Sequence, residues 1–230
     1  MQISAGSPRA ALWAVYELIG GWGVHYLMQG DVMPDDIGAF HLPQINVLRE
    51  PVLQRREFRA INEMANSGVF WTLDQYKKLF DQLAKLRFTG IYIQTYPHQP
   101  WAHYSFRGIE RKSAGLCYGW KHRIHERSIG REHFAALGAD GDHTNPDFAH
   151  CKNYEDWIAT GKRFMRGLFD AARARGLEVT YDHLCSEVPD EFATRLKDLS
   201  VAEGVQLSQE GTIKQSHFSR HGLTYSGGNA

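Results

Sequence analysis

Residues 58–104 read FRAINEMANSGVFWTLDQYKKLFDQLAKLRFTGIYIQTYPHQPWAHY, and this stretch decides the fold. Its ends, residues 58–62 and 90–96, have the short apolar pattern of buried strands. Between them apolar residues recur at helical spacing from Leu73 to Leu86. Strand, helix and strand in this order predict a βαβ unit, and βαβ units build parallel sheets.

The pattern repeats further along the chain. Asn153 is expected to cap a second long amphipathic helix that Gly176 closes, and residues 177–184 follow as a third strand. Residues 98–152 between these units form a long excursion rich in Gly, His and aromatic residues. Pro189 is expected to open a shorter helix after the third strand.

The N-terminal part reads as the end of another α/β unit. Ser7 and Pro8 predict a helix start, the Gly20-Gly21 pair predicts its end, and residues 24–27 read as a short strand. Residues 29–52 are expected to be a connector, because prolines and Asp-Asp and Gly breaks interrupt any regular element.

We therefore predict an α/β protein with a partial (β/α)8 TIM barrel. Residues 1–45 would be the C-terminal part of an accessory α/β domain with its connector. Residues 46–230 would be the N-terminal part of a truncated TIM-barrel domain, with the first three βα units. A complete barrel has eight such units in roughly 250 residues.

Bulk composition excludes several classes of protein. The chain has 230 residues with 43% hydrophobic content, which is too apolar for a disordered chain. Lys+Arg and Asp+Glu both number 26, so the zero net charge argues against nucleic acid or an anionic membrane as the partner. The apolar run at residues 10–28 contains Glu17, His25 and a Gly-Gly break, which argues against a membrane span. The three cysteines form no CxxC pair.

Candidate site residues lie at the C-terminal ends of the three predicted strands, where a parallel barrel holds its ligand. Carboxylates and amides grip hydroxyls, and aromatic rings pack on the C–H face of a sugar, so this mixture predicts a carbohydrate ligand. The predicted substrate-binding residues are Asn62, Glu63 and Asn66 after the first strand, Tyr96, His98, Trp101, His103 and Tyr104 after the second, and Asp182 and His183 after the third.

Four of these residues also have a purely structural interpretation. Trp101 and Tyr104 could cap the barrel mouth, Glu63 could pair with Arg59 or Lys112, and Asp182 could cap the turn after its strand. A zinc site would need three converging ligands. The excursion carries His98, His103, His122 and His125, but it has no HExxH motif, and the Asp140–Asp147 loop lacks EF-hand spacing. We expect no metal and no cofactor.

Two stretches resemble a known superfamily. Ala14-Val15-Tyr16-Glu17-Leu18-Ile19 followed by Gly23-Val24-His25-Tyr26-Leu27 is similar to the end of the small α/β domain that precedes the barrel in family 20 β-hexosaminidases and family 67 α-glucuronidases. Residues 56–67, the helix over 73–87 and Gly90-Ile91-Tyr92-Ile93-Gln94 resemble the start of that barrel. The resemblance covers residues 5–195.

The chain departs from family 20 at the functional positions. Family 20 has a sugar-holding Arg after the first strand, where this chain has Asn62-Glu63-Met64-Ala65-Asn66. Where family 20 has an acidic residue and a Pro-Gly-His turn, only Asp182-His183 is similar here. Nothing after His183 matches the catalytic Asp-Glu pair, and Gln209-Glu210 is only the nearest candidate. The N-acetylhexosamine specificity therefore does not carry over.

The resemblance implies a fragment of a glycoside hydrolase that contributes sugar-binding residues. No catalytic acid or nucleophile is assigned, and we expect residues 1–230 alone not to hydrolyse glycosides. Two alternatives stay open: a metal-dependent TIM-barrel hydrolase or isomerase that uses His98, His103 or His183, and a non-catalytic carbohydrate-binding barrel.

Overall fold

The computed structural model describes residues 2–36, 41–42, 46–61, 68–116, 122–123, 126–127, 131–132, 142–143, 145–183, 191–192, 206–207 and 213–215. The chain divides into two compact units. The first comprises residues 1–59, 73–92 and 167–180, and the second comprises residues 60–72, 93–166 and 181–230.

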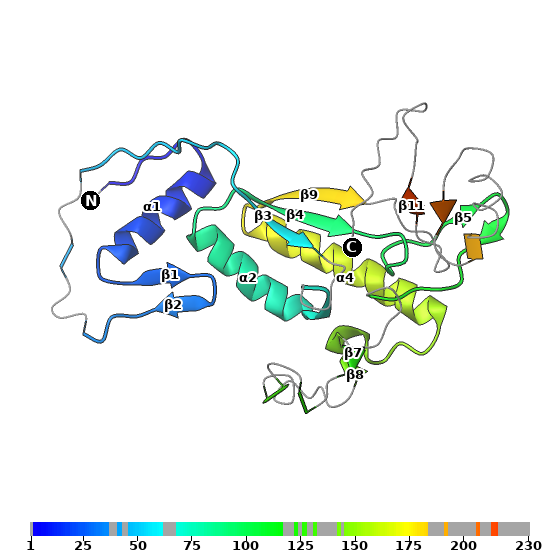
Figure 1. Ribbon diagram of the computed structural model, residues 1–230. Coiled ribbons are helices and arrows are strands. Elements are labelled where there is room, and N and C mark those ends of the chain that lie inside the picture. The colour runs from blue at the N-terminus through cyan, green and yellow to red at the C-terminus, as the bar shows by residue number, and fades with distance from the viewer. Residues whose placement is uncertain are drawn as a thin grey trace. The chain divides into compact units, whose positions relative to one another are not determined.

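A three-stranded parallel sheet is the central element. It consists of β3 (Glu57–Ile61), β4 (Gly90–Thr95) and β9 (Glu178–His183) in the order β3-β4-β9. The three arrows run in one direction in Figure 1. The predicted strand positions, their adjacency and their parallel direction are confirmed.

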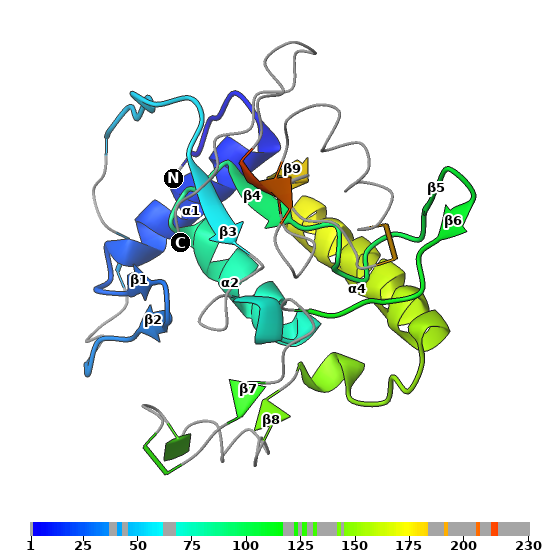
Figure 2. The same ribbon diagram turned by 45° about the vertical axis from the view of Figure 1, so that its right-hand side comes forward.

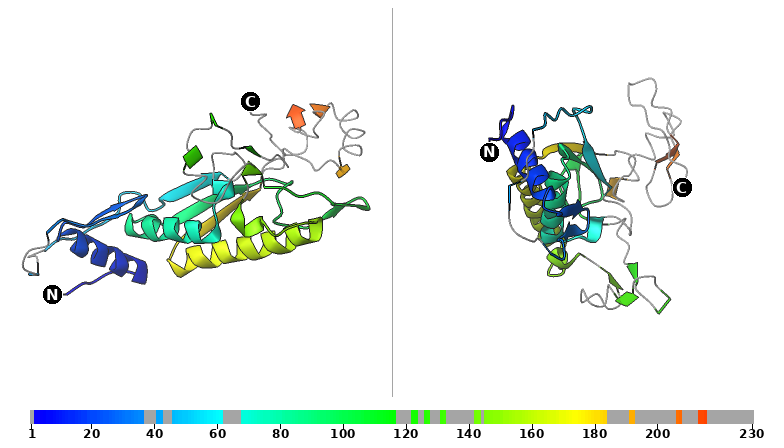
Figure 3. Two further views of the ribbon diagram at one scale, coloured as in Figure 1. Left: turned by 90° about the horizontal axis from the view of Figure 1, so that it is seen from below. Right: turned by 90° about the vertical axis from the view of Figure 1, so that its left-hand side faces the viewer.

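The first unit contains the N-terminal halves of these strands and two helices that cover one side of them. These are α2 (Leu73–Lys85) and the last turns of α4 (Tyr154–Ala174), which lie on the same side of the sheet in Figure 3. Asp81 of α2 accepts two hydrogen bonds from Arg175, at 2.6 and 3.2 Å. The apolar stripe predicted for α2 is its buried face, which contains Tyr76, Leu79, Phe80 and Leu83.

The N-terminal helix α1 (Pro8–Gly20) begins and ends where the sequence predicts. Ser7 Oγ accepts a hydrogen bond from the Ala10 amide at 3.2 Å, which caps the helix, and Gly21 follows its last turn. Arg9 reaches from α1 to the carbonyl oxygens of Thr89 and Gly176, at 3.1 and 3.0 Å. This side chain joins the helix to the loops that precede β4 and β9.

A hairpin follows α1 and corrects one prediction. The strand β1 (His25–Leu27) is confirmed, but it pairs antiparallel with β2 (Gly30–Val32), so the connector expected over 29–52 is wrong at these residues. Gly30 has φ +153° and pairs with Leu27, while Asp31 forms an ion pair with Lys85 of α2. The hairpin is therefore stabilised by a contact distant in sequence rather than by its own apolar alternation.

The second unit contains the N-terminal part of α4 and the loop that follows β4. Asn153 Oδ1 accepts a hydrogen bond from the Asp156 amide at 2.8 Å, so the predicted cap is confirmed. The loop carries a short antiparallel pair, β5 (Ser105–Phe106) and β6 (Ile109–Glu110), which Figure 2 labels on the green loop after β4.

The described residues of the second unit also contain two short antiparallel strand pairs and two 3-10 turns. One of these turns is η1 (Gly68–Phe70). β7 (His122–Arg123) pairs antiparallel with β8 (Asp142–His143), and β10 (Gln206–Leu207) pairs antiparallel with β11 (Ile213–Gln215). The 3-10 turn η2 (Pro146–Phe148) leads into α4. Apart from residues 191–192, the helix predicted after Pro189 lies outside the described residues.

Within the described ranges, no helix combines the length and the apolar character that crossing a membrane requires.

The close approach of α4 to the loop after β4 requires a glycine. A Cβ on Gly161 would lie 2.0 Å from the Pro100 carbonyl oxygen and 2.7 Å from its carbonyl carbon. We expect Gly161→Ala to lower the free energy of unfolding by about 3 kcal/mol, because backbone rather than a flexible side chain must move. Urea denaturation measures this change.

The matched control is Gly20→Ala at the end of α1, where a Cβ would meet nothing within 4 Å. This variant should be as stable as the unmodified chain or slightly more stable, since Ala has the higher helix propensity. Equal stability of both variants would contradict the close packing at Gly161.

Candidate functional site

The C-terminal ends of β4 and β9 meet at Thr95. This fully buried hydroxyl lies 2.7 Å from the Tyr181 hydroxyl oxygen and 3.3 Å from the Asp182 carbonyl oxygen. Burial raises the pKa of Tyr181, so its phenol stays protonated at neutral pH. The Asp182 side chain is half-buried at this edge of the sheet.

The loop after β4 folds back on itself through one glutamine. Gln99 is 1% exposed, and its Oε1 accepts from the Tyr96 amide at 3.0 Å and from Trp101 Nε1 at 2.9 Å. Its Nε2 donates to the Leu116 carbonyl at 2.9 Å. One amide side chain thus satisfies polar groups at three places in the loop. Separately, the Tyr96 hydroxyl accepts a hydrogen bond from the Gln94 side-chain amide at 3.1 Å.

Trp101 packs into an aromatic cluster rather than presenting a free ring face. It stacks on Phe164 of α4 with ring centroids 5.9 Å apart, and it meets Phe148 edge-on at 6.1 Å. Phe148 stacks in turn on Trp157 at 5.3 Å. The cluster fixes the loop to the N-terminal part of α4.

Arg111 is the polar centre of the loop. Its side chain is 1% exposed, yet the guanidinium donates to three backbone carbonyls: Ser113 at 2.8 Å, Ala102 at 2.8 Å, and His98. The guanidinium carbon lies 5.3 Å from the ring centroid of Tyr104 and 6.0 Å from that of Tyr154. Burial lowers the pKa of Arg111, although arginine stays charged at neutral pH.

A glutamate distant in sequence completes the site. Glu191 accepts hydrogen bonds from the amides of Lys112 and Ser113 and, at 2.8 Å, from the Ser113 hydroxyl. The next residue, Phe192, is buried and stacks on Tyr104 with centroids 5.6 Å apart. Burial acts to raise the pKa of Glu191, but the hydrogen bonds outweigh it and the pKa is lowered.

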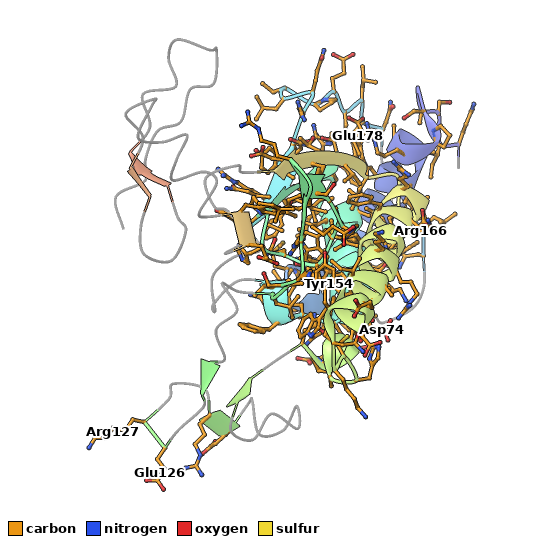
Figure 4. All side chains as sticks on the ribbon, turned by 90° about the vertical axis from the view of Figure 1, so that its right-hand side faces the viewer. Asp74, Glu126, Arg127, Tyr154, Arg166 and Glu178 are labelled. Atoms are coloured by element: carbon orange, nitrogen blue, oxygen red, sulfur yellow. The ribbon has the colours of Figure 1, made fainter. Side chains whose placement is uncertain are left out.

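An open depression of about 510 Å³ lies beside these residues. It is lined by Gly108, Ile109, Glu110, Lys112 and Glu191. Tyr154, labelled in Figure 4, is the first residue of α4. Burial is the main cause that raises the pKa of Tyr154. The exposed His103 Nδ1 lies 2.9 Å from the Tyr154 hydroxyl oxygen.

Six of the predicted site residues have described side chains, and all six belong to the second unit. Tyr96 and His98 have ring centroids 5.9 Å apart, and the Tyr104 hydroxyl donates to the Pro97 carbonyl at 3.0 Å. Asn62, Glu63 and Asn66 lie outside the described residues, and His183 is described only as the last residue of β9. Convergence of the whole set on one surface therefore stays a prediction.

The metal alternative has no support in the part of the chain that the structure describes. In those residues no group of three or more His, Cys, Asp or Glu side chains could hold a metal ion. His125 lies outside the described residues, and His122 is described in its backbone as part of β7.

Sequence reasoning missed Arg111, Tyr154 and Glu191. A charged residue in a loop is usually exposed, so nothing marked Arg111 as buried. Glu191 meets Ser113 across 78 residues of sequence, a pairing that no local pattern predicts.

Comparison with known proteins gave no relative: no family model, no curated protein and no solved structure matches this chain.

The burial of Arg111 gives a stability prediction. Arg111→Met removes the guanidinium donors to the carbonyls of Ala102 and Ser113, and it leaves the His98 carbonyl with the Gly115 amide alone. Partly buried carbonyls that lose their partners are costly. We expect the free energy of unfolding to fall by about 3 kcal/mol, measured by urea denaturation.

The control is Arg166→Met, at a residue exposed on α4 and labelled in Figure 4. Its stability should change by no more than about 0.5 kcal/mol. A small effect of both substitutions would show that solvent or other donors replace the Arg111 contacts.

Proposed function

We propose that this chain is part of a (β/α)-barrel glycoside hydrolase and that it binds carbohydrate at the C-terminal ends of its parallel strands. The observation that carries the proposal is the sheet itself. Its strands are parallel and follow one another in sequence order, and Thr95, Tyr181 and Asp182 meet where β4 and β9 end. Active sites of parallel barrels lie at this end of the strands.

The connections between the strands support a barrel. In the first unit, α2 and the end of α4 lie on the same side of the sheet (Figure 3). A barrel keeps all its helices on the outer side, whereas a doubly wound sheet covers both faces with helices. Sequential strand order with helices on one side is the pattern of consecutive barrel units.

The polar side chains at two places suit a polyhydroxylated ligand. At the end of β9, Asp182 supplies a carboxylate acceptor. In the loop after β4 and at the start of α4, Glu110 supplies a second carboxylate, and His103, Tyr154 and Lys112 supply donors or acceptors. The depression of about 510 Å³ falls within the size range of small-molecule sites. Trp101 would act by holding the loop in place, since its ring packs on Phe164 and Phe148.

Glu191 does not meet the requirements of a catalytic acid. Most glycosidases use two carboxyl groups, one of which donates a proton and needs a raised pKa. The pKa of Glu191 is lowered, and both of its oxygens accept hydrogen bonds from the loop. We therefore assign this chain a binding role and leave the proton donor unassigned.

The test measures the binding of oligosaccharides to the purified chain by saturation-transfer NMR. The panel contains neutral, N-acetylated and uronic-acid-containing oligosaccharides. Asp182→Asn should weaken binding about tenfold or more, because a hydrogen bond to a charged acceptor is lost. Asp170→Asn, at an exposed position of α4, is the matched control and should bind like the unmodified chain.

Absence of binding to every member of the panel would contradict the proposal. Equal affinity of the Asp182 and Asp170 variants would remove Asp182 from the site.

A further inference from the structure

The carboxylate of Glu191 sits in a small anion-binding nest of the loop after β4. The amides of Lys112 and Ser113 both donate to Oε1, the second at 2.5 Å, and the Ser113 hydroxyl donates to Oε2 at 2.8 Å. Consecutive backbone amides that point at one acceptor are a recurrent carboxylate site in proteins. We call this arrangement the Glu191 clamp.

An ionised Glu191 stabilises the positive charges around the clamp. Arg111 and Lys112 bring positive charge, and Glu110 and the phenol of Tyr154 also face this region. Arg111 itself is buried, and the hydrogen bonds that it donates to the loop go to neutral carbonyl oxygens. After burial, which lowers the pKa of Arg111, Tyr104, Tyr154 and the carboxylate of Glu191 act on it. A negative Glu191 therefore stabilises both the nest and the buried guanidinium.

The clamp also bounds the depression. Lys112 and Glu191 are neighbours in its lining, together with Glu110, Gly108 and Ile109. Phe192 stacks on Tyr104, whose ring also lies beside Arg111, so the two residues 191 and 192 attach to one loop through one polar and one apolar contact. Release of Glu191 would change the wall of the depression.

We propose that the Glu191 clamp is an acid-sensitive contact that opens when Glu191 takes up a proton, and that it couples the shape of the depression to pH. Hydrogen bonds to an ionised acceptor are roughly twice as strong as those to a neutral one. Protonation removes that advantage and leaves Arg111 without its neighbouring negative charge. The inference holds for any ligand of the depression and does not depend on a carbohydrate substrate.

The direction of the pH effect follows from the hydrogen bonds. They lower the pKa of Glu191 in the folded chain, so the contact contributes its full stability above the ordinary glutamate value of about 4.3. The contribution is lost as the pH falls through the lower, folded value. The clamp is closed at neutral pH and opens only in acid, below the ordinary pKa of a glutamate.

The test uses amide hydrogen exchange of the full chain, read at Lys112 and Ser113 by NMR and corrected for intrinsic rates. At pH 7, Glu191→Gln should lower the protection of these two amides about tenfold, since the neutral amide keeps the shape of the carboxylate but loses its charge. At pH 3 the unmodified chain should approach the level of the variant.

The matched control is Glu110→Gln, which removes a carboxylate from the same depression without touching the nest. It should keep the protection seen in the unmodified chain at pH 7 and lose it on acidification. Equal protection in Glu191→Gln and the unmodified chain at pH 7 would overturn the proposal, even where the chain unfolds at pH 3. The readout needs no ligand, so the outcome is independent of the carbohydrate-binding test.

Discussion

The buried guanidinium of Arg111 is the interaction on which the candidate site depends. Residues of the loop after β4 have few strand or helix partners for their backbone carbonyls, and buried carbonyls without partners cost free energy. Arg111 supplies donors to three of them at once, and its charge is balanced by the rings of Tyr104 and Tyr154 and by the nearby Glu191. One side chain therefore holds three parts of the loop together.

The regular elements could be predicted from sequence because their patterns are local. Each of these patterns lies within the element that it predicts or directly beside it. Examples are the apolar stripe of α2, the caps at Ser7 and Asn153, and the short apolar run of β4. The hairpin strand β2 lacks such a pattern, and its Asp31 pairs with Lys85 across 54 residues. Contacts of this kind, like that of Glu191 with Ser113, depend on tertiary packing that a sequence pattern does not contain.

The aromatic residues of the site show the limit of reading function from composition. A loop rich in Tyr, Trp, His and Gln predicts a sugar-binding surface, but the same side chains can build the core of a loop. Gln99 and Trp101 do the latter, because their polar atoms bond within the loop and the Trp101 ring stacks on Phe164. His103 and Asp182, which are exposed or half-buried, are better placed to meet a ligand.

The two faces of the sheet differ in a way that bears on the proposed barrel. Side chains alternate between the faces of a strand, and Ile91 and Ile93 of β4 are fully buried on one of them. The other face carries polar contacts: Glu57 Oε1 lies 2.7 Å from Thr180 Oγ1, and the Arg59 guanidinium lies over the Tyr92 ring. Strands covered by helices on both faces are near-continuous apolar runs. One apolar and one polar face therefore favour a sheet with helices on one side only, in agreement with the positions of α2 and the end of α4 in the first unit.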